Sequence, residues 1–503
     1  MSSTHHRNHI VTLLENLARE HPALPLYTFL DAAQKSVAVL TSSDLLRKAT
    51  QIAGLLQGQV LAGKPVLVLS PHGPAFLESL FGVMLAGCVP VPVTFSRRLG
   101  MANIADIIAD TGVEAVLGPK KTLENLRSGR LRPAMLSDTQ HQNLLYLASD
   151  PLPATDWCRP QLLATDVALI YPGLLSDEPL APVALSHSHL LTSVDRLIQA
   201  LGPGSTDSLL TSLDLADGMA LLLHVLLPVR LGLRSYFLPL RQALDDARPW
   251  LQAASRLGCT IISAPPAVLS LAAHDGRNRS DFEPDLSALR SVCVGGDHVA
   301  PGSVLHFIER YQRNGMSAEK LFSCYGLSAV CSFISGRRGF KSCDIDGIAY
   351  LSLGVPDPGL LALFDTGDRL LQSDNELYCR GRCRHRFSQN GFDFQAEDIE
   401  SFVLQVFGAR GLSRCVVLHA EDSRQTVLLA ECATRQLAES WQGVVSKVME
   451  RVLAETGCEL DRVLLLRPGS LPLSVSGMVL RKACAVLLED GSLMLRLLPV
   501  RGK

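Results

Sequence analysis

Short apolar runs alternate with segments of helical periodicity up to about residue 330, and this alternation limits the folds that the chain can adopt. The runs have the length of buried strands and are Pro65–Ser70, Glu114–Gly118, Asp166–Pro172, Ser208–Leu215, Cys259–Pro265 and Ser291–Gly296. Between two of them, Ala75–Cys88 presents a broad apolar face with helical spacing. Parallel strands need long crossover connections, which are usually helices. We therefore expect an α/β fold with parallel sheets covered by helices.

The pattern changes near Gly381, where a compact stretch begins. Its spacing predicts helices near Glu397–Phe407 and Gln436–Thr456, and strands near Cys415–Leu418 and Thr426–Glu431. A chain of 503 residues is also too long for one ordinary hydrophobic core. We expect a large N-terminal domain at residues 1–380, a hinge at 381–386 and a small α+β domain at 387–503.

Composition excludes several classes of protein. Hydrophobic residues make up 47% of the chain and charged residues 19%, which is typical of a globular protein. A formal charge of −2 lacks the basic excess of a nucleic-acid binder. The apolar run Met219–Val229 is too short to span a membrane, and the N-terminus lacks the apolar core of a signal peptide, so we expect a cytoplasmic protein. The 13 cysteines are expected to be reduced, and Cys379 and Cys383 to be packing residues rather than zinc ligands.

Several stretches, taken together, carry a specific pattern. They read ELYCRGRCRHRFSQNGFDFQAEDIE from Glu376, DTGD from Asp365, LFSCYGLSA from Leu321, SVCVGGDHVAPGSVLHFIERY from Ser291 and LPLSVSGMVLRKA from Leu471. Together, in their order along the chain, they resemble the adenylate-forming acyl-activating enzymes, and among these the fatty acyl-AMP ligases. The N-terminal stretch PVLVLSPHGPAFLESLFGVMLAGCVPVPV from Pro65 extends the resemblance to nearly the whole chain.

The resemblance implies a fold and a reaction. A large N-terminal AMP-binding domain with parallel sheets covered by helices and a β-barrel part would be followed by a small α+β C-terminal lid. Such enzymes make an acyl-adenylate and pyrophosphate from ATP and a carboxylic acid, and then pass the acyl group to a carrier protein. Only about 40 positions separate Gly326 from Thr366, so we expect the β-barrel part to be shortened.

The resemblance also implies a nucleotide pocket that accepts AMP or ATP. Its residues would be Gly295, Gly296, Asp297, Tyr325, Gly326, Asp368 and Arg382. Tyr325 would stack on adenine, Asp368 would accept the ribose hydroxyls and Arg382 would form a second ribose or phosphate contact. The Gly295–Asp297 loop would lie beside the adenine. Seen one by one, these are ordinary strand-end and turn residues, so the pocket rests on their joint occurrence.

The motifs that bind phosphates and metal in this family are altered in this chain. The stretch that corresponds to the glycine-rich phosphate loop, Tyr171–His187, has lost nearly every glycine and its lysine. It carries bulk and negative charge instead, at Leu174, Leu175, Asp177 and Glu178. Ala329 stands where a magnesium-binding glutamate is expected, so we expect no complete Mg²⁺ site.

Two further changes concern the acid. Met478 stands where the family places a lysine that neutralises charge during adenylation, and the loss of one such contact costs about 3–4 kcal/mol. Lys482, one helical turn further on, is considered as a substitute for this lysine. Of the His-Asp pair near the acid pocket only Asp217 remains, and the hinge position carries His385. No catalytic residue is assigned from the sequence.

Three hypotheses follow for the function. The first is a divergent ligase-like protein of a fatty-acid, polyketide or nonribosomal pathway whose adenylation is impaired or lost, a pseudoenzyme candidate that binds a nucleotide, an acyl chain or other small carboxylic acid, or an acyl carrier protein. The second is a working acyl-AMP ligase with rearranged catalytic groups. The third is an acyl-condensing enzyme built on the same fold.

Overall fold

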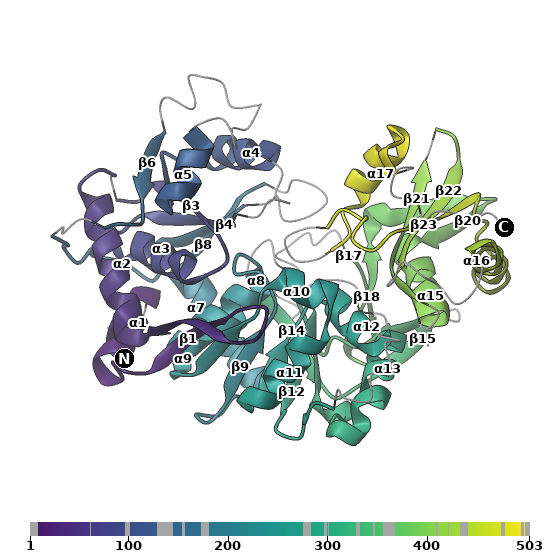
Figure 1. Cartoon of the computed structure of the whole chain (residues 1–503), viewed down its shortest axis with the longest axis horizontal. Helices are drawn as coiled ribbons and strands as arrows, with labels where there is room; N and C mark the ends of the chain where they lie inside the picture. The colour runs from purple at the N-terminus through teal and green to yellow at the C-terminus, as the bar shows by residue number, and fades with distance from the viewer. Residues whose placement is uncertain are drawn as a thin grey trace. The chain divides into compact units, whose positions relative to one another are not determined.

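The computed structural model divides into two compact units, residues 1–240 with 326–333 and residues 241–325 with 334–503 (Figure 1). The structure describes residues 9–503 except 61, 96–100, 128–143, 153–155, 173–180, 275–282, 296–298, 300, 328–331, 346–347, 356–367, 409–410, 421, 433–440, 474–477, 494–496 and 498–503. Within this part of the chain, no helix combines the length and the apolar character that crossing a membrane requires.

The first unit alternates strands and helices, as the apolar runs predict. Its strands are β1 Pro25–Leu30, β2 Ser36–Thr41, β3 Pro65–Ser70, β4 Val89–Thr94, β5 Ala115–Gly118, β6 Leu145–Ala148, β7 Val167–Tyr171, β8 Val183–Ser186, β9 Ser208–Thr211 and β10 Arg234–Phe237. Its helices are α1 Ile10–Glu20, α2 Ser42–Gln57, α3 Pro74–Leu85, α4 Met101–Thr111, α5 Lys120–Arg127, α7 His187–Leu201, α8 Gly218–Ala220, the π-helix η3 Leu221–Leu226 and α9 Leu227–Leu231.

Parallel pairing dominates the first unit. One sheet has the order β4-β3-β5-β6 and is parallel throughout. Its strands β3 and β4 are buried along almost their whole length, as expected of strands covered on both faces. The strands β9, β10 and β1 also pair in parallel, and β2 adds an antiparallel edge to β1. Helix α3 contacts β3, β4 and β5, so the predicted apolar face does cover a sheet.

The second unit contains the remaining elements. Its helices are α10 Leu240–Asp245, α11 Arg248–Leu257, α12 Pro266–His274, α13 Pro301–Tyr311, α15 Ala396–Phe407, α16 Trp441–Thr456 and α17 Arg481–Glu489, with 3-10 turns at Gln312–Asn314, Ala318–Lys320 and Cys383–His385. Its strands are β11 Ile261–Ser263, β12 Ser291–Gly295, β13 Leu321–Leu327, β14 Ser332–Arg338, β15 Ser342–Ile345, β16 Ile348–Leu351, β17 Asp368–Ser373, β18 Glu376–Arg382, β19 Arg386–Gln389, β20 Phe392–Gln395, β21 Leu412–Ala420, β22 Gln425–Cys432 and β23 Arg462–Leu466.

Two antiparallel hairpins lie where the shortened barrel is expected. Strands β11, β12 and β13 first continue the parallel pattern. The hairpin β15-β16 and the hairpin β17-β18 then follow, and a bridge between Ser352 and Tyr378 connects them. Beyond β18, the turn Cys383–His385 leads directly into the hairpin β19-β20.

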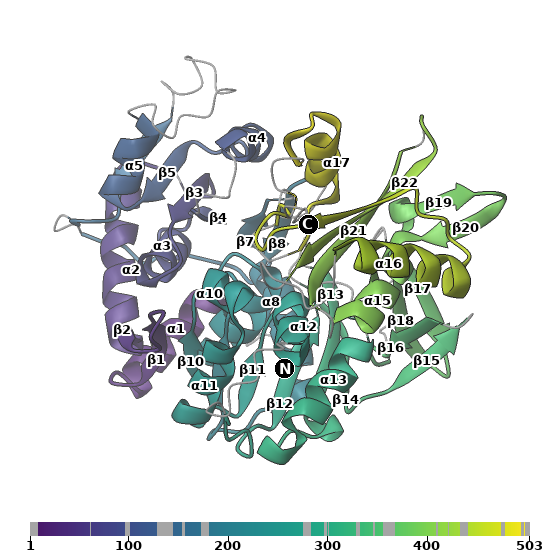
Figure 2. The ribbon, with the colours of Figure 1, turned by 45° about the vertical axis from the view of Figure 1, so that its right-hand side comes forward.

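The C-terminal part of the second unit is an α+β layer structure. Strands β21, β22 and β23 form one sheet, in which side chains alternate between two cores. Cys415 and Val417 face the core with α15 and α16, whereas Val416 and Leu418 face the core with α17. Figure 2 shows α15 and α16 along one face of this sheet and α17 on the other.

The predicted fold class is confirmed. The strand predicted at Pro65–Ser70 matches β3 at both ends, and the helix predicted at Glu397–Phe407 begins one residue earlier as α15. The helix predicted at Gln436–Thr456 is described from Trp441 onward. The division into domains at 1–380, 381–386 and 387–503 stays a prediction.

Candidate nucleotide-binding site

Three of the predicted pocket residues meet around one carboxylate. Asp368 begins β17, and its cross-strand partner in β18 is Arg382. Arg382 Nη1 lies 2.8 Å from Asp368 Oδ1, and the hydroxyl of Tyr325, on β13, donates to Asp368 Oδ2 at 2.6 Å. Asp368 is thus bonded at both of its carboxylate oxygens, by Arg382 at one and by Tyr325 at the other.

The electrostatics of Asp368 reflect its burial. Only 8% of its side chain is exposed. Burial raises the pKa of Asp368, while the positive charge of Arg382 and the hydrogen bond from Tyr325 act in the opposite direction. The structure thus brings Tyr325, Asp368 and Arg382 together, while their roles toward a nucleotide stay a prediction.

The other predicted pocket residues are placed only in part. Gly295 ends β12, and a Cβ atom there would lie 2.3 Å from the carbonyl oxygen of Cys324 on the neighbouring strand. Close approach of two strands therefore requires a glycine at this position, independently of any ligand. Gly326 follows Tyr325 within β13, whereas Gly296 and Asp297 lie outside the described residues.

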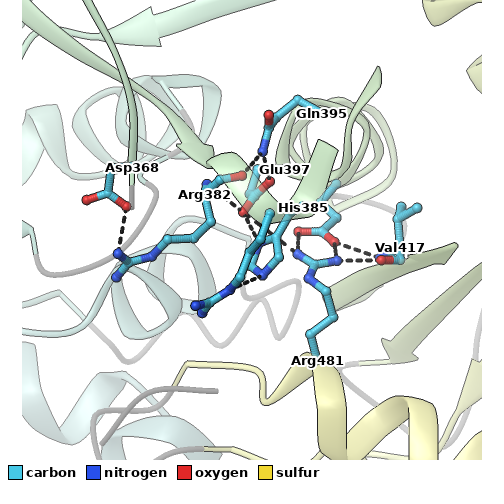
Figure 3. A network of polar contacts seen from close by, with 9 residues as sticks. Asp368, Arg382, His385, Gln395, Glu397, Val417 and Arg481 are labelled. Atoms are coloured by element: carbon cyan, nitrogen blue, oxygen red, sulfur yellow. Dashed lines mark hydrogen bonds and ion pairs between the residues drawn. The ribbon is translucent and has the colours of Figure 1, made fainter. Parts of the chain in front are cut away.

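Arg382 is held from the other side by residues of the hairpin β19-β20 and of α15. Its backbone N–H donates to Glu397 Oε1 at 3.2 Å, and its carbonyl accepts from Gln395 Nε2 at 2.7 Å. Glu397 also bonds Nδ1 of His385, the residue at the predicted hinge position. Figure 3 shows these residues next to the Asp368–Arg382 pair.

Arg481 extends this network to the C-terminal motif. It begins α17, and its guanidinium bonds Glu400 Oε1 at 2.6 Å, Glu400 Oε2 at 3.1 Å and the carbonyl oxygen of Val417 (Figure 3). Glu397 Oε1 lies 4.0 Å from the same guanidinium. Burial raises the pKa of Glu400 to about 7, although the Arg481 charge lowers it. The buried carboxylates thus hold Arg481 in place.

Met478 lies three residues before Arg481 and is partly buried. A bridge between Leu473 and Val479 and a hydrogen bond from Leu480 N to Pro472 O, at 2.9 Å, close the loop that carries it. Lys482, the alternative cation, is an exposed residue of α17. The structure therefore places a thioether on the loop where the family lysine is expected.

The altered phosphate loop connects two antiparallel strands. Tyr171 ends β7 and pairs with Val183 at the start of β8. Leu174, Leu175, Asp177 and Glu178 lie outside the described residues, as does Ala329. Among the described residues, no group of three or more His, Cys, Asp or Glu side chains is arranged to hold a metal ion.

Asp217 caps a helix in the first unit, and a second, partly buried aspartate, Asp214, lies three residues before it. Asp217 Oδ1 accepts from the backbone N–H groups of Met219 and Ala220, at 2.9 and 3.2 Å. Asp214 accepts from the Thr94 hydroxyl at 2.5 Å and from Ala216 N at 2.9 Å. Burial raises the pKa of both aspartates to about 6. Sequence reasoning missed Asp214.

The family model of the AMP-binding enzymes matches residues 14–170 and 181–382, so the chain belongs to the AMP-binding enzyme family. It is 22% identical to the medium-chain-fatty-acid–[acyl-carrier-protein] ligase JamA of Moorena producens (strain JHB), over 96% of this chain and 95% of that protein. The resemblance to fatty acyl-AMP ligases that the motifs carry is thereby confirmed.

Solved structures show the same fold. A structure from work on the fatty acyl-adenylate ligases of E. coli and L. pneumophila has a TM-score of 0.81 at 18% identity, over 96% of this chain and 98% of that one. The A-PCP structure of McyG with phenylalanyl-adenylate has a TM-score of 0.79 at 16% identity, over 96% of both chains.

Proposed function

We propose that this protein binds an adenine nucleotide and an acyl group on the acyl-AMP ligase fold but adenylates carboxylic acids poorly or not at all. The observation that carries the proposal is the state of the C-terminal motif. Met478 cannot supply the positive charge that adenylation requires, and the neighbouring Arg481 is bound to Glu400 and to the carbonyl of Val417. Loss of one such electrostatic contact costs about 3–4 kcal/mol of transition-state stabilisation.

The phosphate loop supports the same proposal. The family model leaves residues 171–180 unmatched, and this stretch lies within the altered loop that has lost its lysine and nearly all its glycines. Backbone N–H groups cradle a triphosphate best where small residues let them approach it. We infer that triphosphate and Mg²⁺ are bound weakly, whereas the nucleoside part is retained through Tyr325, Asp368 and Arg382.

The ligands and partners are proposed from the relatives. The name of the Moorena relative describes transfer of a medium-chain fatty acid to an acyl carrier protein. By analogy, this protein would take an acyl chain or another small carboxylic acid and meet an acyl carrier protein within a fatty-acid, polyketide or nonribosomal pathway. Such a role can be fulfilled by binding alone, and we propose that it takes place in the cytoplasm.

An active acyl-AMP ligase is the second candidate. The cluster of Tyr325, Asp368 and Arg382 favours it, because Tyr325 and Arg382 both contact Asp368, the proposed ribose acceptor. The third candidate is an acyl-condensing enzyme that uses an already activated acyl group. Such an enzyme would need no contacts to a triphosphate.

Calorimetric titration with AMP and with magnesium-ATP tests the binding part of the proposal. Wild type should bind AMP, Asp368→Asn should bind it at least about tenfold more weakly, and Asp374→Asn should behave as wild type. Asp374 is a matched control because it is an exposed residue at the turn of the same β17-β18 hairpin. No heat of AMP binding to wild type would contradict retention of the nucleoside site.

A further inference from the structure

The carboxylate of Glu397 gathers contacts from several segments of the second unit. It accepts the backbone N–H of Arg382 at 3.2 Å and Nε2 of Gln395 at 2.7 Å, and it bonds Nδ1 of His385. Only 7% of Glu397 is exposed. Burial alone would raise the pKa of Glu397, but the bond from His385 and the charge of Arg481 outweigh it and hold the pKa at about 2. The group is therefore a buried, ionised and well-bonded carboxylate.

The predicted hinge is the segment that this carboxylate binds. Both polar backbone groups of Arg382 are occupied by residues beyond the hinge, the N–H by Glu397 and the carbonyl by Gln395. The side chain of the same arginine holds Asp368 at 2.8 Å. One residue thus joins the start of α15 to the nucleotide carboxylate, as Figure 3 shows.

The absence of a side chain at Gly381 allows Glu397 to lie against the hinge backbone. Its φ of +114° is in the region that favours glycine, and a Cβ atom would lie 2.6 Å from Cδ of Glu397. The carboxylate therefore rests directly on the first peptide of the predicted hinge.

A second contact holds the same helix turn to residues before the hinge. Tyr350 donates its hydroxyl to Asp398 Oδ1 at 2.7 Å, and Arg380 Nη2 lies 3.3 Å from Asp398 Oδ2. Arg380 Nε also donates to the Tyr350 hydroxyl at 3.0 Å. The first turn of α15 is thus fastened by Glu397 and by Asp398.

We propose that Glu397 is a latch: it holds the hinge in one conformation, restrains rotation of the C-terminal domain and positions Arg382 against Asp368. Rotation would require the bonds to Arg382 and His385 to break together. The latch couples the orientation of the lid to the nucleotide carboxylate, so this inference rests in part on the proposed nucleotide binding. Glu397 is a positioning residue, since it acts on the site through Arg382.

Limited trypsin digestion tests the latch without any nucleotide. The hinge region carries Arg380, Arg382, Arg384 and Arg386, so trypsin can cut it at several peptide bonds once it opens. The variants are Glu397→Gln and the milder His385→Ala. Asp393→Asn is the matched control, because Asp393 forms an exposed ion pair with Arg386 in the adjacent hairpin. Thermal unfolding reports whether each variant is folded.

The rate of cleavage tracks the population of the open hinge. We expect cleavage at Arg380–Arg386 to be at least about tenfold faster in Glu397→Gln and about threefold faster in His385→Ala, with Asp393→Asn unchanged. If Glu397→Gln does not fold, the cleavage rate of His385→Ala tests the latch. Cleavage at the wild-type rate in the folded variants would overturn the latch.

The coupling to the nucleotide site has a separate readout. AMP affinity should fall about threefold to tenfold in Glu397→Gln, and the same substitution should have no further effect in Asp368→Asn. If wild type binds no AMP, the proposed nucleotide binding is wrong. The trypsin experiment would still test the latch, because it uses no nucleotide. Equal AMP affinity in wild type and Glu397→Gln would overturn the coupling.

Discussion

Asp368 and Arg382 are cross-strand partners in β17 and β18, and the guanidinium lies 2.8 Å from the carboxylate. Arg382 is at the same time the last residue of β18 and a residue of the predicted hinge. The charge partner of Asp368 therefore belongs to the predicted hinge segment. A change in that segment is expected to reach the site through this one pair.

Tyr325→Phe should destabilise the protein more at pH 8 than at a pH below 3.8, the ordinary pKa of an aspartate. The hydroxyl of Tyr325 favours the ionised form of Asp368, so its loss raises the pKa of Asp368 further. When the pKa of a carboxyl group is raised in the folded state, the group's contribution to folding stability is lost as pH rises through that pKa. We expect the free energy of unfolding to fall by about 1–2 kcal/mol at pH 8 and by less at about pH 3.5, measured by urea unfolding. Tyr236→Phe, at a half-buried tyrosine of β10, is the control, and an equal loss at both pH values would argue against this account.

Gly381→Ala should cost far more stability than Gly391→Ala. Both glycines have positive φ, +114° and +82°, but a Cβ atom at Gly391 meets nothing within 4 Å, whereas at Gly381 it meets Glu397. Backbone strain alone costs about 1 kcal/mol, and the clash adds about 2 kcal/mol or more. Urea unfolding of both variants measures the difference. Similar costs would mean that Glu397 does not rest on the hinge.

Asp214→Asn should flatten the dependence of stability on pH. Burial raises the pKa of Asp214 to about 6, above its ordinary value of 3.8, so the folded state binds a proton that the unfolded state has released. This contribution to stability is complete below about pH 4 and is lost as pH rises through about 6. Asparagine can still accept the Thr94 hydroxyl.

Thermal unfolding of wild type and Asp214→Asn between pH 4 and 8 checks this prediction. Between pH 4 and pH 8, the free energy of unfolding of the variant should rise by on the order of 2 kcal/mol relative to that of wild type. Parallel curves for the two proteins would show that Asp214 is not a buried, proton-binding group.

Local patterns predicted the strands, because a strand depends on a short stretch of sequence. The apolar run Pro65–Ser70 could be assigned to a strand from its length. The nucleotide roles of Tyr325, Asp368 and Arg382 rest on the family resemblance and stay a prediction, although the structure does bring the three side chains together. The partner of Asp214 is Thr94, 120 residues away, so no local spacing could indicate it.

The latch was missed for a related reason. Glu397 is an ordinary acidic residue in the first turn of a helix, where carboxylates are common. Its contact with His385 depends on how β19-β20 folds back, which the sequence pattern does not specify. The charged residues Glu400 and Arg481, which bond each other in the structure, belong to the motifs named above. They could have drawn attention to the neighbouring Glu397.

Mass spectrometry for acyl-AMP tests the central claim most directly. Wild type and Met478→Lys are each incubated with magnesium-ATP and carboxylic acids from short to long chain. We predict no acyl-AMP from wild type above the level without protein, and product from Met478→Lys only if the lost lysine alone blocks the reaction. Acyl-AMP formed by wild type over many turnovers, as by a working ligase, would contradict the claim that adenylation is impaired.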